Sequence, residues 1–170
     1  KTANLLLNFA IKRLAEIFGI IIFFSGLILF ISLISYSPDD PNFIFPENTQ
    51  IKNLLGFQGS FISDLFFQSV GLIAYLISFS LLITGINIFN TKEFFLIIEN
   101  SFFIILYSIF GSLFLTHFYS DIFTLYINGN GGFIGNYFNE TFLNSLILLN
   151  EKIFYYILIL ITLILFLISI

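Results

Sequence analysis

The chain contains no cysteine, no methionine and no tryptophan, and only 9% of its 170 residues are charged. The absence of cysteine excludes a disulfide framework, thiolate metal ligands and thiol catalysis from this sequence. Six lysines and arginines in a chain of net charge −4 provide too little positive charge for an extended groove that binds nucleic acid. The scarcity of charge also leaves too few side chains to cover the surface of a water-soluble domain.

Hydrophobic residues are abundant instead. They make up 58% of the chain, with 26 phenylalanines, and the mean hydropathy is +1.03. This composition is typical of an integral membrane protein. The sequence starts at Lys1 and stops at Ile170 inside an apolar run, which favours a segment of a longer protein.

Four charge-free runs are long enough to cross a bilayer, since a hydrocarbon core of about 30 Å needs about 20 residues of helix. The predicted spans cover about residues 17–37, 65–90, 100–120 and 153–170. A fifth run, Ile122–Asn139, is rejected because its glycines and asparagines would leave costly unpaired polar groups in lipid. The sequence therefore predicts an all-α integral membrane fold with four transmembrane helices, forming a single membrane domain over residues 1–170.

The distribution of lysine and arginine predicts the orientation of these spans. An even number of spans places both termini on the same side, and that side also contains the short connector between the second and third spans. It carries four cations, and the opposite side carries two: Lys1, Lys12, Arg13 and Lys92 against Lys52 and Lys152. We therefore expect both termini in the cytoplasm and both long connectors in the periplasm of a bacterial inner membrane.

The two long connectors differ from the spans in their pattern. The first contains two prolines and two acids after the first span, and Ser60 or Ser63 is expected to cap the helix that follows. In the second, apolar residues recur at steps of three or four, with Asn136, Glu140 and Asn144 on the other face. This pattern predicts one interfacial helix over about residues 132–149.

The two connectors also resemble each other. Gly56-Phe57-Gln58-Gly59 corresponds to Gly132-Phe133-Ile134-Gly135, and an acid follows at the same spacing in each, Asp64 and Glu140. One interpretation is a duplicated hairpin, with two parallel repeats related by an axis along the membrane normal. The other is that Gly-x-x-Gly recurs by chance in a chain rich in phenylalanine.

Small residues form stripes on two of the predicted spans. Because lipid removes the hydrophobic driving force between helices, small side chains that allow close backbone approach favour helix association. The stripes supply the candidate packing or interface residues: Gly71, Ala74, Ser78 and Gly85 on the second span, and Ser108 and Ser112 on the third. Packing within one chain and a subunit interface of an oligomer both remain open from the sequence.

The sequence offers no group of residues for catalysis. All ten acids lie outside the four spans, so no intramembrane acid is available for a proton relay. His117 stands alone near the outer end of the third span and is expected to form a hydrogen bond there rather than to bind a metal. Asp39, Asp40 and Glu47 are loop acids with no specific metal-binding spacing. The sequence therefore predicts no catalytic residue, no metal ligand and no cofactor in this chain.

The order of loop motifs resembles the N-terminal four-span membrane domain of the FtsK/SpoIIIE family of bacterial DNA translocases. Three motifs carry the resemblance: Ser35-Tyr36-Ser37-Pro38-Asp39-Asp40-Pro41 after the first span, Asn53-Leu54-Leu55-Gly56-x-x-Gly59 with Asp64 before the second, and Gly131-Gly132-Phe133-Ile134-Gly135 before the last. The family-signature loop residues are thus Pro38, Asp40, Pro41, Asn53, Gly56, Gly59, Asp64, Gly132 and Gly135.

The resemblance implies a membrane anchor that interacts with other division proteins, self-associates and holds a cytoplasmic motor at the division septum. The motor that uses ATP and DNA would lie beyond this chain, after a linker, so the chain itself would not be an enzyme. Its direct partners would be the lipid bilayer, further copies of itself and other division proteins. A small transporter or channel subunit is the alternative, favoured by the possible repeat and opposed by the lack of charge within the spans. An integral membrane enzyme comes third because it lacks catalytic residues.

Overall fold

The computed structural model describes residues 2–41, 50–120 and 128–170, with the backbone alone for residues 2–6 and 142–144. The described residues form helices and no strand, in the order α1 (Thr2–Ile34), α2 (Gly56–Val70), a 3-10 turn η1 (Gly71–Ile73), α3 (Ala74–Thr91), α4 (Leu96–Phe118), α5 (Gly132–Asn139), α6 (Phe142–Leu149) and α7 (Glu151–Ile168). Four helical segments are long and apolar enough to cross a membrane: Leu7–Ile34, Gly56–Thr91, Leu96–Phe118 and Glu151–Ile168. The predicted all-α membrane fold is confirmed.

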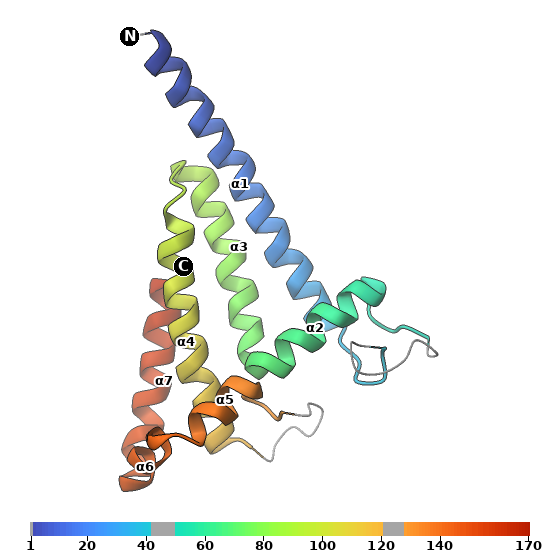
Figure 1. The fold of residues 1–170 in the computed structure, drawn as a ribbon, viewed down its shortest axis with the longest axis vertical. Helices are drawn as coiled ribbons and strands as arrows, with labels where there is room; N and C mark the ends of the chain where they lie inside the picture. The colour runs from blue at the N-terminus through green and yellow to red at the C-terminus, as the bar shows by residue number, and fades with distance from the viewer. Residues whose placement is uncertain (1, 42–49, 121–127) are drawn as a thin grey trace.

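The long helices pack in pairs, α1 against α3 and α4 against α7 (Figure 1). The short helices α2, α5 and α6 gather at one end of the bundle, which we call the short-helix end. The turn between α3 and α4 lies at the opposite end, here called the turn end, and the first turns of α1 extend beyond it (Figure 1). The first hairpin, α1 to α3, and the second, α4 to α7, contact each other where α3 packs on α4 and where α2 meets α5.

The predicted second span differs from one straight helix. Residues 65–70 belong to α2, which crosses the end of α1, and the chain then bends through η1 into α3 (Figure 1). The bend occurs at Gly71, whose φ of +62° lies in the left-handed region that side chains disfavour. The α3 axis therefore begins at Ala74, and α2 forms a separate element across the short-helix end.

The predicted interfacial helix over residues 132–149 is divided into α5 and α6. The break follows Asn139, where the Thr141 N–H bonds to the Phe138 carbonyl at 3.2 Å and the Thr141 hydroxyl donates to the same oxygen at 2.6 Å. A threonine side chain that bonds the local backbone competes with continued helix, and the periodicity did not reveal this. The side chain of Asn144, part of the predicted polar face, lies outside the described residues.

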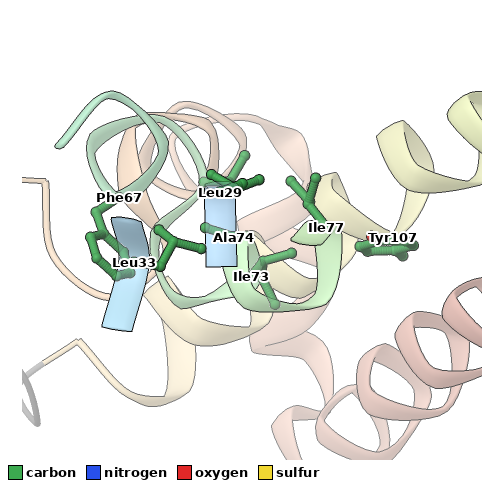
Figure 2. Packing of buried hydrophobic residues seen from close by; sticks show 8 residues of the cluster. Leu29, Leu33, Phe67, Ile73, Ala74, Ile77 and Tyr107 are labelled. Atoms are coloured by element: carbon green, nitrogen blue, oxygen red, sulfur yellow. The ribbon is translucent and has the colours of Figure 1, made fainter. Parts of the chain in front are cut away.

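The core lies where α1, α2, α3 and α4 meet, close to the short-helix end. Its buried residues include Leu29 and Leu33 from α1, Phe67 from α2, Ala74 from α3 and Tyr107 from α4 (Figure 2). The Phe67 ring also packs edge-on against Tyr36 with centroids 4.9 Å apart. This cluster fixes the loop that follows α1 against the start of α3.

Glycines set the distance between α1 and α3. A Cβ added to Gly85 would lie 2.5 Å from the backbone nitrogen of Phe23 and 2.7 Å from the carbonyl oxygen of Gly19. One added to Gly26 would lie 3.0 Å from the carbonyl oxygen of Ser78. Of the predicted stripe on the second span, Ala74, Ser78 and Gly85 are buried within the chain. Gly85 and the Ser78 backbone lie where α1 packs closely on α3.

Gly85→Ala is expected to force the α1 and α3 backbones apart, because the atoms it would meet belong to main chain and cannot rotate away. The expected loss is about 1–3 kcal/mol of stability. The measurement is the midpoint of unfolding in increasing SDS, followed by near-ultraviolet circular dichroism. Ile105→Phe, which enlarges an exposed position on α4, is the control and should leave the midpoint unchanged. Equal midpoints for Gly85→Ala and the parent chain would contradict the packing role.

Candidate functional site

Asp40 closes the first long connector onto the end of α1. Its side chain is 2% exposed, and its carboxylate accepts the backbone N–H groups of Lys52 and Asn53, each at 2.8 Å. The Asn53 side chain then donates to the Ser32 carbonyl at 2.9 Å and accepts the N–H of Leu55 at 3.0 Å. Hydrogen bonds to a carboxylate are stronger than neutral ones. This Asp40–Asn53 lock therefore fixes the loop before α2 begins.

The start of α2 packs against this lock. A Cβ on Gly59 would lie 2.1 Å from the Asn53 amide oxygen, so only glycine allows the helix to approach so closely. The Ser60 hydroxyl donates to the Pro41 carbonyl at 3.0 Å. Asp64 is 7% exposed and accepts a hydrogen bond from the Tyr36 hydroxyl at 3.3 Å. The structure thus brings together the signature residues Asp40, Pro41, Asn53, Gly59 and Asp64, which the sequence could only order along the chain.

Other residues of this region have different outcomes. Pro38 is exposed. Gly56 begins α2 with a φ of +65° and has nothing within 4 Å of an added Cβ, so glycine is needed there for its backbone conformation and not for close packing. The predicted cap at Ser60 or Ser63 is wrong, because α2 already begins at Gly56 and both hydroxyls are buried in its first turns. Outside the lock, the Asp39 carboxylate lies 2.7 Å from the Lys52 ammonium and raises the pKa of Lys52 through that hydrogen bond.

The two hairpins meet backbone to backbone at Gly71. The N–H of Leu72 donates to the Asn130 carbonyl at 2.9 Å, and a Cβ on Gly71 would lie 1.8 Å from that oxygen. A Cβ on Gly132, which has a φ of +65°, would lie 2.6 Å from the Gly71 nitrogen. The Ser112 hydroxyl of α4 donates to the Val70 carbonyl at 3.0 Å. We call this contact the Gly71–Asn130 crossing.

Amide side chains surround the crossing. Asn128 donates its N–H and its side-chain amide to Gln68, at 3.3 and 3.2 Å, and Asn136 donates to the Asn128 carbonyl at 3.0 Å. Gly135 packs on α4, where an added Cβ would lie 2.4 Å from the Ser112 carbonyl oxygen. The pairing of Asn128 with Gln68 was not predicted from the sequence. Asn128 belongs to the run Ile122–Asn139, which the sequence analysis rejected as a fifth span because of its polar residues.

The remaining predicted residues lie inside the bundle or beside it. Ser112 belongs to the crossing, whereas the Ser108 hydroxyl is buried with no hydrogen-bond partner among the residues that the structure describes. His117 faces Asn139 with 3.2 Å between Nδ1 and Oδ1, which agrees with the expected hydrogen bond. In the spans, the Ser80 hydroxyl lies 3.0 Å from the Tyr107 hydroxyl and 2.9 Å from that of Ser169. These contacts join helices through neutral hydroxyl groups.

The two halves of the chain repeat one arrangement. In each, a long helix leads through a loop to a short helix whose first residue is a glycine with a φ of +65°, Gly56 in α2 and Gly132 in α5. The short helices contact each other across the crossing, and each half returns with an apolar helix, α3 or α7. This arrangement agrees with the duplicated-hairpin interpretation, with α6 as an addition in the second half.

The geometry defines a helical membrane domain whose buried polar groups hold its loops together. Among residues 2–41, 50–120 and 128–170, no group of three histidine or acidic side chains could hold a metal ion. The matching family is described as the 4TM region of DNA translocase FtsK/SpoIIIE, and the match covers residues 11–169. The chain belongs to this family, and the resemblance inferred from the loop motifs is confirmed.

Individual relatives agree with the family. The chain is 32% identical over 129 residues to the DNA translocase FtsK of Rickettsia typhi, covering 76% of this chain and 17% of that protein. It is 40% identical over 81 residues to that of Rickettsia bellii, covering 48% and 10%, and 30% identical over 131 residues to that of Rickettsia prowazekii, covering 77% and 18%. The chain thus spans less than a fifth of the length of these relatives. No solved structure matches it.

Proposed function

We propose that this chain is the membrane anchor and interaction domain of a septal DNA translocase that acts in cell division and chromosome segregation. The single observation that carries the proposal is the family match over residues 11–169, which includes all four apolar helices and both polar loops. In this proposal the loops contribute contact surfaces. Partners in this proposal are the lipid bilayer, further copies of the chain and other division proteins.

The proposal assigns no catalysis and no cofactor to the chain itself. ATP hydrolysis and DNA translocation would belong to a motor in the rest of the protein, since the aligned residues make up less than a fifth of the relatives named as DNA translocases. Tethering raises the local concentration of such a motor at its site of action without any new contact. The loop residues that the structure describes do not contain the pattern Gly-x-x-x-x-Gly-Lys-Ser/Thr, which binds nucleotide phosphates.

We propose that the turn end faces the cytoplasm and the short-helix end faces the periplasm of a bacterial inner membrane. The arrangement of cations supports this, because Lys92 and Arg13 both pair with Glu16 at the turn end. Lys52 lies in the connector at the short-helix end, and Lys152 opens α7 there (Figure 1). An excess of lysine and arginine marks the cytoplasmic side of a membrane protein.

Single-cysteine labelling tests this orientation against a background without native cysteine. Leu54→Cys and Glu140→Cys replace exposed residues at the short-helix end, and Phe95→Cys replaces one in the turn. The first two are expected to react with a membrane-impermeant maleimide in intact spheroplasts, and the third only after permeabilisation. The reverse pattern would contradict the orientation.

The anchor function is tested by localisation. Residues 1–170 fused to a fluorescent protein are expected to collect at division sites in a cell that carries the full-length protein or lacks it. A fusion of the remainder of the protein, without these residues, should stay dispersed. An even distribution of the 1–170 fusion over the membrane, together with solute flux in reconstituted vesicles, would replace the anchor by the transporter alternative.

A further inference from the structure

An apolar groove runs along the outside of the α1–α3 pair near the turn end. It has a volume of about 370 Å³ and is lined by the two contacting glycines, Gly19 and Gly85, with Phe23, Ile86 and Phe89 among its walls. The glycines bring the helix backbones together and leave a depression where side chains would otherwise stand. Ligand pockets in proteins occupy roughly 300–1,000 Å³, so the groove is large enough to hold part of an acyl chain.

Cations stand at the mouth of this groove. Lys92 lies directly above one of its walls, with its ammonium 4.5 Å from the centre of the Phe89 ring and bonded to the Phe89 carbonyl. The Glu16 carboxylate lies 2.8 Å from the Lys92 ammonium and 2.5 Å from the Arg13 guanidinium. Glu16 is about one helical turn before Gly19, the first groove residue on α1. The cluster is therefore continuous with the groove rather than separate from it.

The cation cluster keeps unused hydrogen-bond donors and positive charge. Arg13 is 58% exposed and has five N–H donors, of which the contact with Glu16 occupies one nitrogen, and Lys12 beside it is exposed. Two cations, Arg13 and Lys92, thus pair with the single acid Glu16, and Lys12 precedes Arg13 in the chain. The other acids of this end, Glu93 and Glu99, lie exposed in the turn and on α4. A phosphate placed here would meet a net positive, partly unsatisfied set of donors.

We propose that this site binds an anionic glycerophospholipid of the leaflet at the turn end. One acyl chain lies in the Gly19–Gly85 groove, and the phosphate is bound by Arg13 and Lys92, with Lys12 adding attraction. Charge complementarity favours this occupant over a helix of a second copy. That helix would fill the groove but leave the cluster unpaired. Basic pockets between transmembrane helices are known to hold anionic headgroups in this way.

The test uses the 170-residue chain purified in a neutral detergent and native mass spectrometry with two lipids of identical acyl chains. The probes are palmitoyl-oleoyl phosphatidylglycerol and palmitoyl-oleoyl phosphatidylcholine. The chain is expected to retain one phosphatidylglycerol more strongly than phosphatidylcholine, by about fivefold for each cation that contributes. Arg13→Gln combined with Lys92→Asn should bring the two lipids close to equal retention. Asparagine is chosen because Lys92 has a φ of +65°.

Matched variants separate the site from general attraction. Lys52→Gln with Lys152→Gln removes the same charge at the short-helix end and should leave the preference intact. Ile86→Trp fills the groove and should lower phosphatidylglycerol retention, whereas Ile105→Trp on the exposed face of α4 should not. Glu16→Gln releases both cations and should raise retention, a gain that a folding defect cannot produce.

Three outcomes would overturn the proposal. The Arg13 and Lys92 double variant could keep the preference of the parent chain, or the Lys52 and Lys152 variant could lose as much of it. Ile86→Trp could instead abolish a dimer without changing lipid retention, which would assign the groove to a second copy.

Discussion

Gly71→Ala is expected to cause the largest loss of stability of any single-methyl change considered for this chain. The new Cβ would lie 1.8 Å from the Asn130 carbonyl oxygen, a main-chain atom of the other hairpin. In addition, the backbone at this residue has a φ of +62° and a ψ of −142°, a combination close to a region almost confined to glycine, which costs an L-residue about 1–3 kcal/mol. Overpacking against the backbone adds about 1–3 kcal/mol, so the total expected loss is about 2–6 kcal/mol. The measurement is the SDS unfolding midpoint.

Gly56→Ala is the matched control because Gly56 has nearly the same φ, +65°, with nothing within 4 Å of an added Cβ. It isolates the conformational cost, about 1–2 kcal/mol, from the steric one. The expected order is therefore parent chain, Gly56→Ala, Gly71→Ala. Equal losses in the two alanine variants would mean that the Gly71–Asn130 crossing does not form at the distance described.

Asp40→Ala is expected to open the first long connector. The substitution leaves two backbone N–H groups without their acceptor, those of Lys52 and Asn53, of which Asn53 is buried. Hydrogen bonds to charged groups contribute about 1.5–3 kcal/mol each, so the expected loss is about 3–5 kcal/mol when the two bonds act together. Limited proteolysis of the 40–53 connector should accelerate, and the unfolding midpoint should fall.

Two further substitutions at this connector make the interpretation specific. Asp40→Asn keeps one acceptor oxygen and should give an intermediate effect. Asp39→Ala removes the exposed neighbouring acid, whose partner is the exposed Lys52 side chain, and surface ion pairs of this kind contribute little. Equal rates of connector proteolysis in Asp39→Ala and Asp40→Ala would contradict the Asp40–Asn53 lock. They would mean that the two acids act through their negative charge alone.

Sequence reasoning predicted the helical content and the membrane location because both depend on local composition. Long runs without charge predict spans, and the prolines and glycines mark where they end. The same reasoning could not find the bend at Gly71, since a glycine inside an apolar run also suits a packing stripe. Its φ of +62° is set by Asn130, which lies far along the chain. Contacts between residues so far apart in the chain produce no periodic pattern in the sequence.

The signature loop residues show a similar division. The sequence identified Asp40, Asn53 and Gly59 as members of ordered motifs, but their mutual contacts depend on how the connector folds back. Gln68 and Asn128 were missed because neither belongs to a motif and they lie 60 residues apart in the chain. The division of the predicted helix at residues 140–141 had a detectable signal, a threonine whose hydroxyl competes for the local backbone.

The Gly71–Asn130 crossing has a mechanical consequence. Along the spans, the two hairpins touch through side chains such as Ser80 and Tyr107, which can slide past one another by changing rotamer. At the crossing, main chain meets main chain, and relative sliding must break the bond from Leu72 to Asn130 and lift Gly132 past Gly71. Relative sliding of the hairpins is therefore resisted by main chain at this crossing, in addition to the side-chain contacts of α3 with α4 and α7.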